Sequence, residues 1–145
     1  RLHGPATLIH DPAMTTLTDT GMTVPELFTD ADGLARFRER PVALTEGTPV
    51  TRLSALAPSG GWQLRHSPVG FASDFHCTTT PQWLVVLQGR MEIGLRDGSA
   101  RVFGPGECFH SNDTLPAGAV FDATLHGHRS RLLGDEPLVT LFVRT

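Results

Sequence analysis

The sequence predicts an all-β domain that closes into a barrel or jelly roll. From Pro41 onward, apolar residues occur in short runs with an alternation of about two residues, and turn-forming residues interrupt these runs every 8 to 12 residues or so. No long amphipathic helical pattern occurs in this part of the sequence. Closure of a set of about eight to ten short strands would remove or protect the edges of the sheet.

The expected strands follow one another with few residues between them. They cover residues 51–56, 62–66, 71–78, 83–87, 91–96, 99–103, 108–111, 123–132 and 138–143. Asp97-Gly98 is a strong hairpin signal, and Gly104-Pro105-Gly106 predicts a sharp turn. Residues 1–27 are rich in Thr, Pro and Gly and show no sustained period. We therefore expect an irregular N-terminal arm or leader over 1–27 and a single barrel domain over 28–145.

Composition excludes several classes of function. The 145 residues have a net charge of −3, which gives no basic footprint for nucleic acid. No apolar stretch reaches the roughly 20 residues of a membrane-spanning helix. The chain has no lysine and no tyrosine, so a lysine Schiff base and a catalytic phenol are both excluded. Two cysteines do not make a disulfide scaffold, and a cytoplasmic bacterial protein is the default expectation.

Five residues reproduce the spacing of a known motif. Gly70 precedes His76 by five residues, Thr78 and Gln82 follow, and Gly89 closes the pattern. This resembles the first motif of the cupin superfamily, G(X)5HXH(X)3–4E(X)6G. Two chemical positions differ, because Thr78 stands in place of the second histidine and Gln82 in place of the glutamate.

A second cupin-like motif follows. Gly104-Pro105-Gly106-Glu107 supplies its turn, and the later histidine arrives as His126-Gly127-His128 after an insertion near residues 116–125. The resemblance covers about residues 36–143 and is to small single-domain bacterial cupins of unassigned function. It implies an RmlC-like double-stranded β-helix, the cupin jelly-roll barrel. Cupins include dioxygenases, isomerases, decarboxylases, storage proteins and sugar-binding domains, so the resemblance specifies the fold more than the activity.

The motif residues predict a metal site. Residues two apart on a strand share a face, so His126 and His128 are expected to point the same way, towards His76. The candidate ligands are His76, Gln82, His126 and His128. Imidazoles with one amide oxygen suit a divalent transition metal such as Fe, Mn, Ni or Zn. The competing interpretation is that these are hydrogen-bonded core or rim histidines around a pocket without metal.

Other polar residues are expected around the same pocket. The candidate pocket residues are His66, Asp74, Thr78 and His110. Arg65 alternates with His66 and is expected outside the barrel, as is Arg129 opposite His128. Asp113 lies beside the insertion, where a carboxylate would suit a general base, although a turn residue is the favoured interpretation.

Three functions remain open at this point. The first is a metal-dependent enzyme that acts on a small organic substrate by oxygenase, isomerase or lyase chemistry. The second is a non-catalytic module that binds a small molecule, which the differences at Thr78 and Gln82 favour. The third is a structural barrel whose pocket is filled by side chains. The apolar run from Trp83 to Leu87 reads as a strand buried on both faces, which favours a homodimer.

Overall fold

The computed structural model describes residues 15–145, and within this range it forms strands and no helix. The strands are β1 (Thr16–Leu17), β2 (Gly21–Thr29), β3 (Ala35–Ala43), β4 (Glu46–Thr48), β5 (Thr51–Leu53), β6 (Trp62–Ser67), β7 (Gln82–Gln88), β8 (Arg90–Gly94), β9 (Ala100–Phe103), β10 (Cys108–Asn112), β11 (Arg129–Leu133) and β12 (Leu138–Arg144). The predicted all-β class is therefore confirmed. This part of the chain contains no helix that is long and apolar enough to span a membrane.

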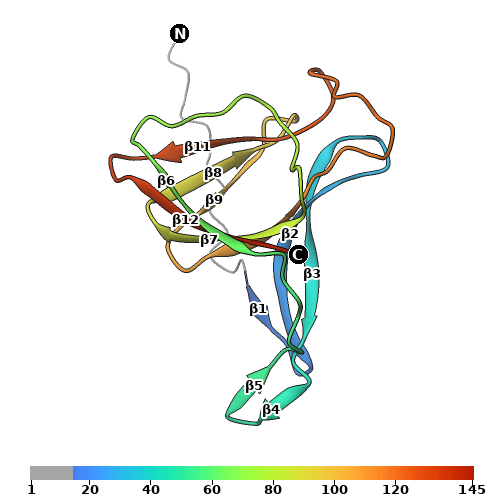
Figure 1. Ribbon diagram of the computed structural model, residues 1–145, viewed down its shortest axis with the longest axis vertical. Helices are drawn as coiled ribbons and strands as arrows, with labels where there is room; N and C mark the ends of the chain where they lie inside the picture. Colours follow the sequence, from blue (N-terminus) through green and yellow to red (C-terminus); the bar gives the residue numbers. More distant parts are fainter. Residues whose placement is uncertain (1–14) are drawn as a thin grey trace.

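Two sheets make up the body of the molecule (Figure 1). The larger has seven strands in the order β1-β2-β10-β7-β12-β6, with β3 paired to β2. The smaller has three strands in the order β11-β8-β9. The hairpin β4–β5 projects from the body beyond the ends of β2 and β3 (Figure 1).

The hydrophobic core lies between the two sheets. Leu84 and Val86 point inward from β7, and Met91 and Ile93 point inward from β8, because every second residue of a strand faces the same side. Phe103 closes the core from β9, stacked 4.5 Å from the ring of Phe109 in β10. The other face of β7 is only partly buried, because Trp83 and Val85 are half-buried there and Leu87 is exposed.

The N-terminal segment differs from the expected arm. The boundary predicted between residues 27 and 28 falls inside β2, which pairs with β3 on one side and with β10 on the other. Leu27 has no exposed surface and belongs to the core. Pro25 and Glu26 interrupt the apolar alternation, which is why the sequence conceals this strand. Any expectation for residues 1–14 lies outside the described residues.

Two expected strands are mostly irregular. The segment 71–78 forms only isolated bridges, at Ala72 to Arg131 and at His76 to His128. Of the expected strand 123–132, only the part from Arg129 belongs to a strand, β11. The cause is Gly127, whose φ of 90° lies in the left-handed region that favours glycine. The Asp97-Gly98 hairpin is confirmed between β8 and β9.

Candidate functional site

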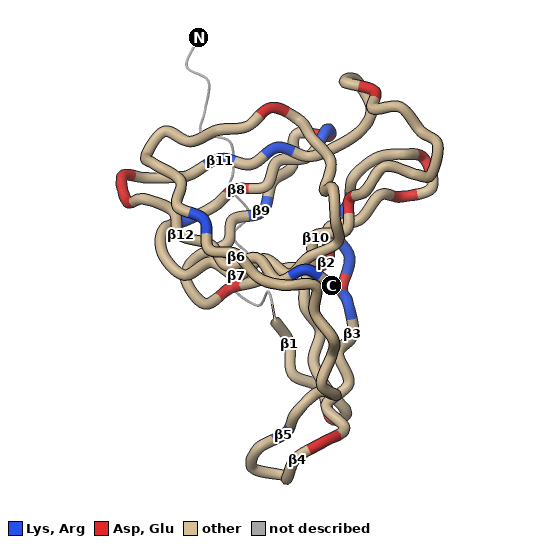
Figure 2. The backbone as a smooth tube through the Cα atoms, in the orientation of Figure 1, with Lys and Arg blue, Asp and Glu red and all other residues tan. Residues whose placement is uncertain are grey.

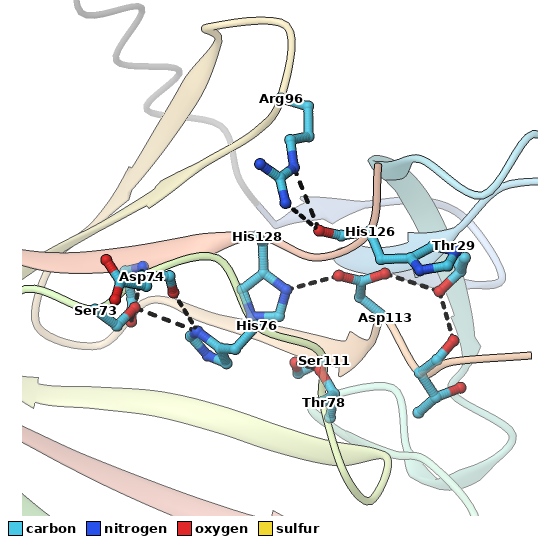
Figure 3. Close-up of polar contacts among 12 residues, drawn as sticks. Thr29, Ser73, Asp74, His76, Thr78, Arg96, Ser111, Asp113, His126 and His128 are labelled. Atoms are coloured by element: carbon cyan, nitrogen blue, oxygen red, sulfur yellow. Dashed lines mark hydrogen bonds and ion pairs between the residues drawn. The ribbon is translucent and has the colours of Figure 1, made fainter. Parts of the chain in front are cut away.

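His76 and His128 face each other across a backbone bridge. The amide of His76 donates to the carbonyl of His128 at 2.8 Å, and the amide of His128 donates back at 3.0 Å. Their ring centroids are 4.7 Å apart, and both side chains line a cavity of about 230 Å³. The two residues that carry the motif resemblance are therefore brought together at one cavity (Figure 3).

Asp113 holds the imidazole of His128. The Asp113 Oδ2 atom lies 2.7 Å from His128 Nδ1, and the residue has no exposed surface. The hydroxyl of Thr29 lies 2.8 Å from the other carboxylate oxygen and 2.8 Å from the carbonyl oxygen of Thr114, so these two acceptors share its one proton (Figure 3). A carboxylate accepts the Nδ1 proton, which leaves the Nε2 atom of His128 with a free lone pair.

The ring of His76 is held in a similar way by a backbone group. Its Nδ1 lies 2.9 Å from the carbonyl oxygen of Asp74 and 3.3 Å from the hydroxyl of Ser73. Since a carbonyl only accepts, Nδ1 carries the proton and Nε2 is again free. Burial lowers the pKa of His76, the Asp74 carbonyl partly offsets this, and His128 lowers the pKa further. His76 is therefore neutral at neutral pH.

Neutral polar groups complete the inner wall. Thr78 and Ser111 are both buried, and their hydroxyl oxygens are 2.7 Å apart. One hydroxyl donates to the other, which leaves one of the two protons available to a ligand. Gln82 lines the same cavity, so the structure brings three of the four candidate ligands, His76, Gln82 and His128, to one place.

His126 lies apart from that set. It is absent from the cavity wall, and its Nδ1 accepts a hydrogen bond from the amide of Asp122 at 3.0 Å. The left-handed Gly127 breaks the strand alternation that would have aligned His126 with His128. The carbonyl of His126 accepts from Arg96 at 2.8 Å. The expectation of a shared face is wrong, and His126 instead anchors the inserted loop.

The predicted roles of His66 and Arg65 are reversed. Both residues keep exposed surface, but Arg65 lines the cavity, whereas His66 lies on the opposite face of β6 and is absent from the cavity wall. The guanidinium of Arg65 stacks over the rings of Phe142 at 4.8 Å and Phe71 at 5.4 Å. Alternation fixes that the two residues oppose each other, but the sequence does not specify which face of β6 turns inward.

His110 also lies away from the cavity. Its Nδ1 is 2.7 Å from the carboxylate of Glu26, and its ring meets the edge of Trp83 on the outer side of the larger sheet. Its strand neighbour Phe109 points inward and lines the cavity. Burial lowers the pKa of His110, which the hydrogen bond to Glu26 partly offsets. Asp74 contributes only its carbonyl, because it is exposed and absent from the cavity wall.

A second, more apolar hollow adjoins the inner cavity. It has a volume of about 440 Å³ and shares the stretch from His76 to Thr79 with the inner cavity. Its other walls are Phe75, Leu115 and Phe121. We call this hollow the vestibule. Together the two spaces fall within the range of about 300 to 1,000 Å³ that is usual for small-molecule sites.

The donor set around the cavity is small for a metal ion. Within residues 15–145, no three or more His, Cys, Asp and Glu side chains are grouped so that they could hold one. Catalytic zinc sites usually have three such protein ligands. Here two neutral imidazoles and the amide of Gln82 are the donors, and the nearest carboxylate, Asp113, is engaged with His128 and Thr29. The residues therefore do not form a complete set of metal ligands.

Ser111 is a site residue that the sequence interpretation missed, and Asp113 is one for which it favoured a turn residue over a general base. A signal for both exists in the alternation of β10, because Phe109 and Ser111 point inward and Asp113 continues that face. The burial of Asp113 and its contact with His128 appear only in the folded chain, so the sequence alone could not reject a turn residue at this position.

No protein-family model matches the chain, and no curated protein matches it. Among solved structures it is similar to an oxalate decarboxylase, with 17% identity, a TM-score of 0.37 and coverage of 99% of this chain and 32% of the other. The chain thus spans about a third of that protein. It is also similar to a "putative mannose-6-phosphate isomerase" from Ralstonia eutropha JMP134, with 20% identity, a TM-score of 0.32 and coverage of 99% and 97%. No statement about activity follows from either similarity.

The architecture itself agrees with the motif resemblance. The first-motif histidine, His76, is bridged to His128, and the turn at Gly104 to Glu107 leads into β10. The described residues form two facing sheets with a polar cavity between them, an all-β arrangement of the kind that the motif resemblance implies.

Proposed function

We propose that the chain is an enzyme that moves a proton on a small organic molecule bound in the cavity. The observation that carries this proposal is the pair Asp113 and His128, with a carboxylate that has no exposed surface 2.7 Å from Nδ1. An imidazole oriented in this way presents a free Nε2 as a general base, and the carboxylate stabilises the imidazolium that forms.

The proton transfer balances within one substrate. His128 Nε2 takes a proton from a carbon beside a carbonyl, and the electron pair of that C–H bond moves into an enolate. The spare hydroxyl proton of the Thr78–Ser111 pair is available to the developing oxyanion. The imidazolium of His128 then returns its proton to a neighbouring atom, which gives an isomer. His76, neutral and with a free Nε2, accepts a hydrogen bond from a substrate hydroxyl and orients it.

A metal-dependent variant of this site remains the second candidate. The observation that favours it is that both imidazoles have their Nδ1 atoms anchored, as metal-binding histidines usually do. His76, His128 and Gln82 would be the ligands of an Fe, Mn, Ni or Zn ion, which would act as a Lewis acid. Within residues 15–145 the donor set for such an ion is incomplete.

The test is hydrogen–deuterium exchange into small carbonyl compounds in D2O, followed by NMR. The wild type is expected to accelerate loss of a C–H signal, and His128→Gln to reduce the rate by about 100-fold or more. Asp113→Asn should have a similar effect. Elemental analysis of protein purified without chelator separates the two candidates, since stoichiometric metal that is lost in His76→Ala would favour the metal site. Binding of a ligand that is never altered would favour the non-catalytic module.

A further inference from the structure

Arg65 is a cavity residue that the proton transfer above does not use. It lines the same space as His76 and His128, and two phenylalanine rings hold its guanidinium in place. None of the ion pairs formed within residues 15–145 involves Arg65. Four other arginines of the larger and smaller sheets are paired, namely Arg36, Arg38, Arg40 and Arg131.

Among the residues that the structure describes, this guanidinium has no counter-ion. Partial burial of the guanidinium lowers the pKa of Arg65, although the residue as a whole is exposed, and guanidinium remains protonated in proteins. A guanidinium that lines a cavity and has no ion-pair partner offers charge-assisted hydrogen bonds to an anionic ligand. The planar fork of donors matches a carboxylate in geometry, and the rings of Phe142 and Phe71 lie against the guanidinium.

The vestibule is apolar, in contrast to the cation at Arg65. Phe75, Leu115 and Phe121 form its walls, and it joins the inner cavity along His76 to Thr79. Phe75 is fixed from behind by the guanidinium of Arg96, 3.7 Å from its ring centroid. Phe121 lies in the inserted loop that His126 anchors through the amide of Asp122. The site therefore joins one unpaired cation, two bases and an apolar chamber.

We propose that the substrate is a small amphipathic carboxylate. Its carboxylate pairs with Arg65, its reacting carbon lies beside His128, and its aromatic ring or alkyl chain occupies the vestibule. This inference rests on the proposed function of the same cavity and names the class of molecule on which it acts. The apolar walls at Phe75, Leu115 and Phe121 disfavour a sugar phosphate, whose hydroxyl groups would lose their hydrogen bonds there.

The test measures binding by calorimetry and ligand-observed NMR. The probes are phenylacetate, 3-phenylpropanoate and hexanoate, with 3-phenylpropan-1-ol as the probe without a carboxylate and propanoate as the probe without a tail. At least one of the three tailed acids is expected to bind about 10- to 100-fold more tightly than either control probe. If none of the three binds better than both controls, the inference is overturned.

Matched variants assign the two ends of the ligand. Arg65→Gln should weaken binding of the tailed acid by about tenfold or more and leave binding of the alcohol unchanged. Arg90 is an exposed arginine on β8, and Arg90→Gln should change the binding of neither probe. Phe121→Ala should weaken binding of the tailed acid but not binding of propanoate. Val120 is exposed in the same loop, so Val120→Ala is the control and should leave both affinities unchanged. An Arg65→Gln protein that binds the acid as well as the wild type contradicts the inference.

Failure of this inference can be distinguished from failure of the proposed function. Binding is measured again in Asp113→Asn and in His128→Gln, in which proton transfer should be lost but Arg65 and the vestibule are intact. Retained acid binding without any exchange in the wild type would reject the proton transfer and keep the substrate class. Exchange that proceeds equally well in Arg65→Gln would reject the substrate class and keep the proton transfer.

Discussion

Asp113 and His128 form a buried pair in which the Oδ2 atom of the carboxylate lies 2.7 Å from Nδ1 of the imidazole. The two residues come from opposite ends of the inserted loop, so the insertion closes at its base on a polar contact. The carboxylate of Asp113 also contacts the hydroxyl of Thr29 in β2. The backbone carbonyl of Asp113 accepts a hydrogen bond from the amide of Thr78. Asp113 thereby connects the N-terminal strand, the first motif and the second motif.

Removal of this carboxylate is expected to destabilise the fold. Asp113→Ala leaves the Nδ1 proton of His128 without its acceptor, while the hydroxyl of Thr29 keeps the carbonyl of Thr114. The free energy of unfolding should fall by about 2 to 3 kcal/mol, as is usual when buried donors lose a charged partner. Urea denaturation measures the change. Asp135→Ala in an exposed loop is the control and should stay within about 0.5 kcal/mol of the wild type.

Gly127 is expected to control the register of the two histidines. A Cβ atom at this position would lie 2.6 Å from the carbonyl oxygen of His76, and the φ of 90° is itself unfavourable for alanine. Gly127→Ala should therefore lower the free energy of unfolding by about 2 kcal/mol or more.

Gly118→Ala separates the two causes. Gly118 has a similar φ of 77°, but no atom lies within 4 Å of an added Cβ. Gly118→Ala should lower the free energy of unfolding by only about 1 to 2 kcal/mol, which is the cost of a left-handed backbone conformation for alanine. If the free energy of unfolding falls equally in the two variants, the close approach of Gly127 to His76 has no role in stability.

Stability should decrease as the solution becomes acidic. Burial lowers the pKa of both His110 and His76 below the ordinary 6.5, so the unfolded chain binds protons first as pH falls. Their contribution is complete above pH 6.5 and is lost as pH falls towards the folded pKa values.

Glu26 adds a second loss at lower pH. Burial alone would raise the pKa of Glu26, but its hydrogen bonds to Arg40, Arg38 and His110 outweigh burial and lower it below 4.5. Its contribution is therefore lost below that pH. Unfolding curves from pH 8 to about pH 2 measure both decreases in stability, and His110→Gln should make the first one smaller. A wild-type stability that does not change between pH 7 and 5 would contradict the assignment.

The outer face of the larger sheet is expected to form the predicted homodimer. Trp62 and Leu64 are 67% and 59% exposed on β6, and β12 places Val143 and Leu141 directly beside them on the same face. A contiguous apolar face of this kind usually marks an interface. Light scattering should give twice the 15.7 kDa chain mass for the wild type and one chain mass for Leu64→Glu.

Val120→Glu is the control for that experiment. Val120 is 86% exposed but lies in the inserted loop, away from β6, so its substitution should leave the dimer intact. A wild-type protein that is monomeric at all concentrations would reject the homodimer. Dissociation by both variants would show that added charge, and not the sheet face, controls association.

The sequence predicts the class of fold and the central pair of histidines, because motif spacing and alternation are local properties. It identifies His76 and His128 correctly as neighbours at one cavity. It fails where the outcome depends on distant pairing. The inward turn of Arg65 depends on the pairing of β6 with β12, and the displacement of His126 depends on the close approach of Gly127 to His76.

The central claim is that Asp113 and the Asp74 carbonyl leave both imidazoles with a proton on Nδ1 and a free lone pair on Nε2. Long-range 1H–15N NMR of the uniformly labelled protein at pH 7.5 reports the tautomer of each histidine directly. We expect His128 and His76 to show a protonated Nδ1 and an unprotonated Nε2, and Asp113→Asn to change the signals of His128. A protonated Nε2 on His128 in the wild type would contradict its role as the general base.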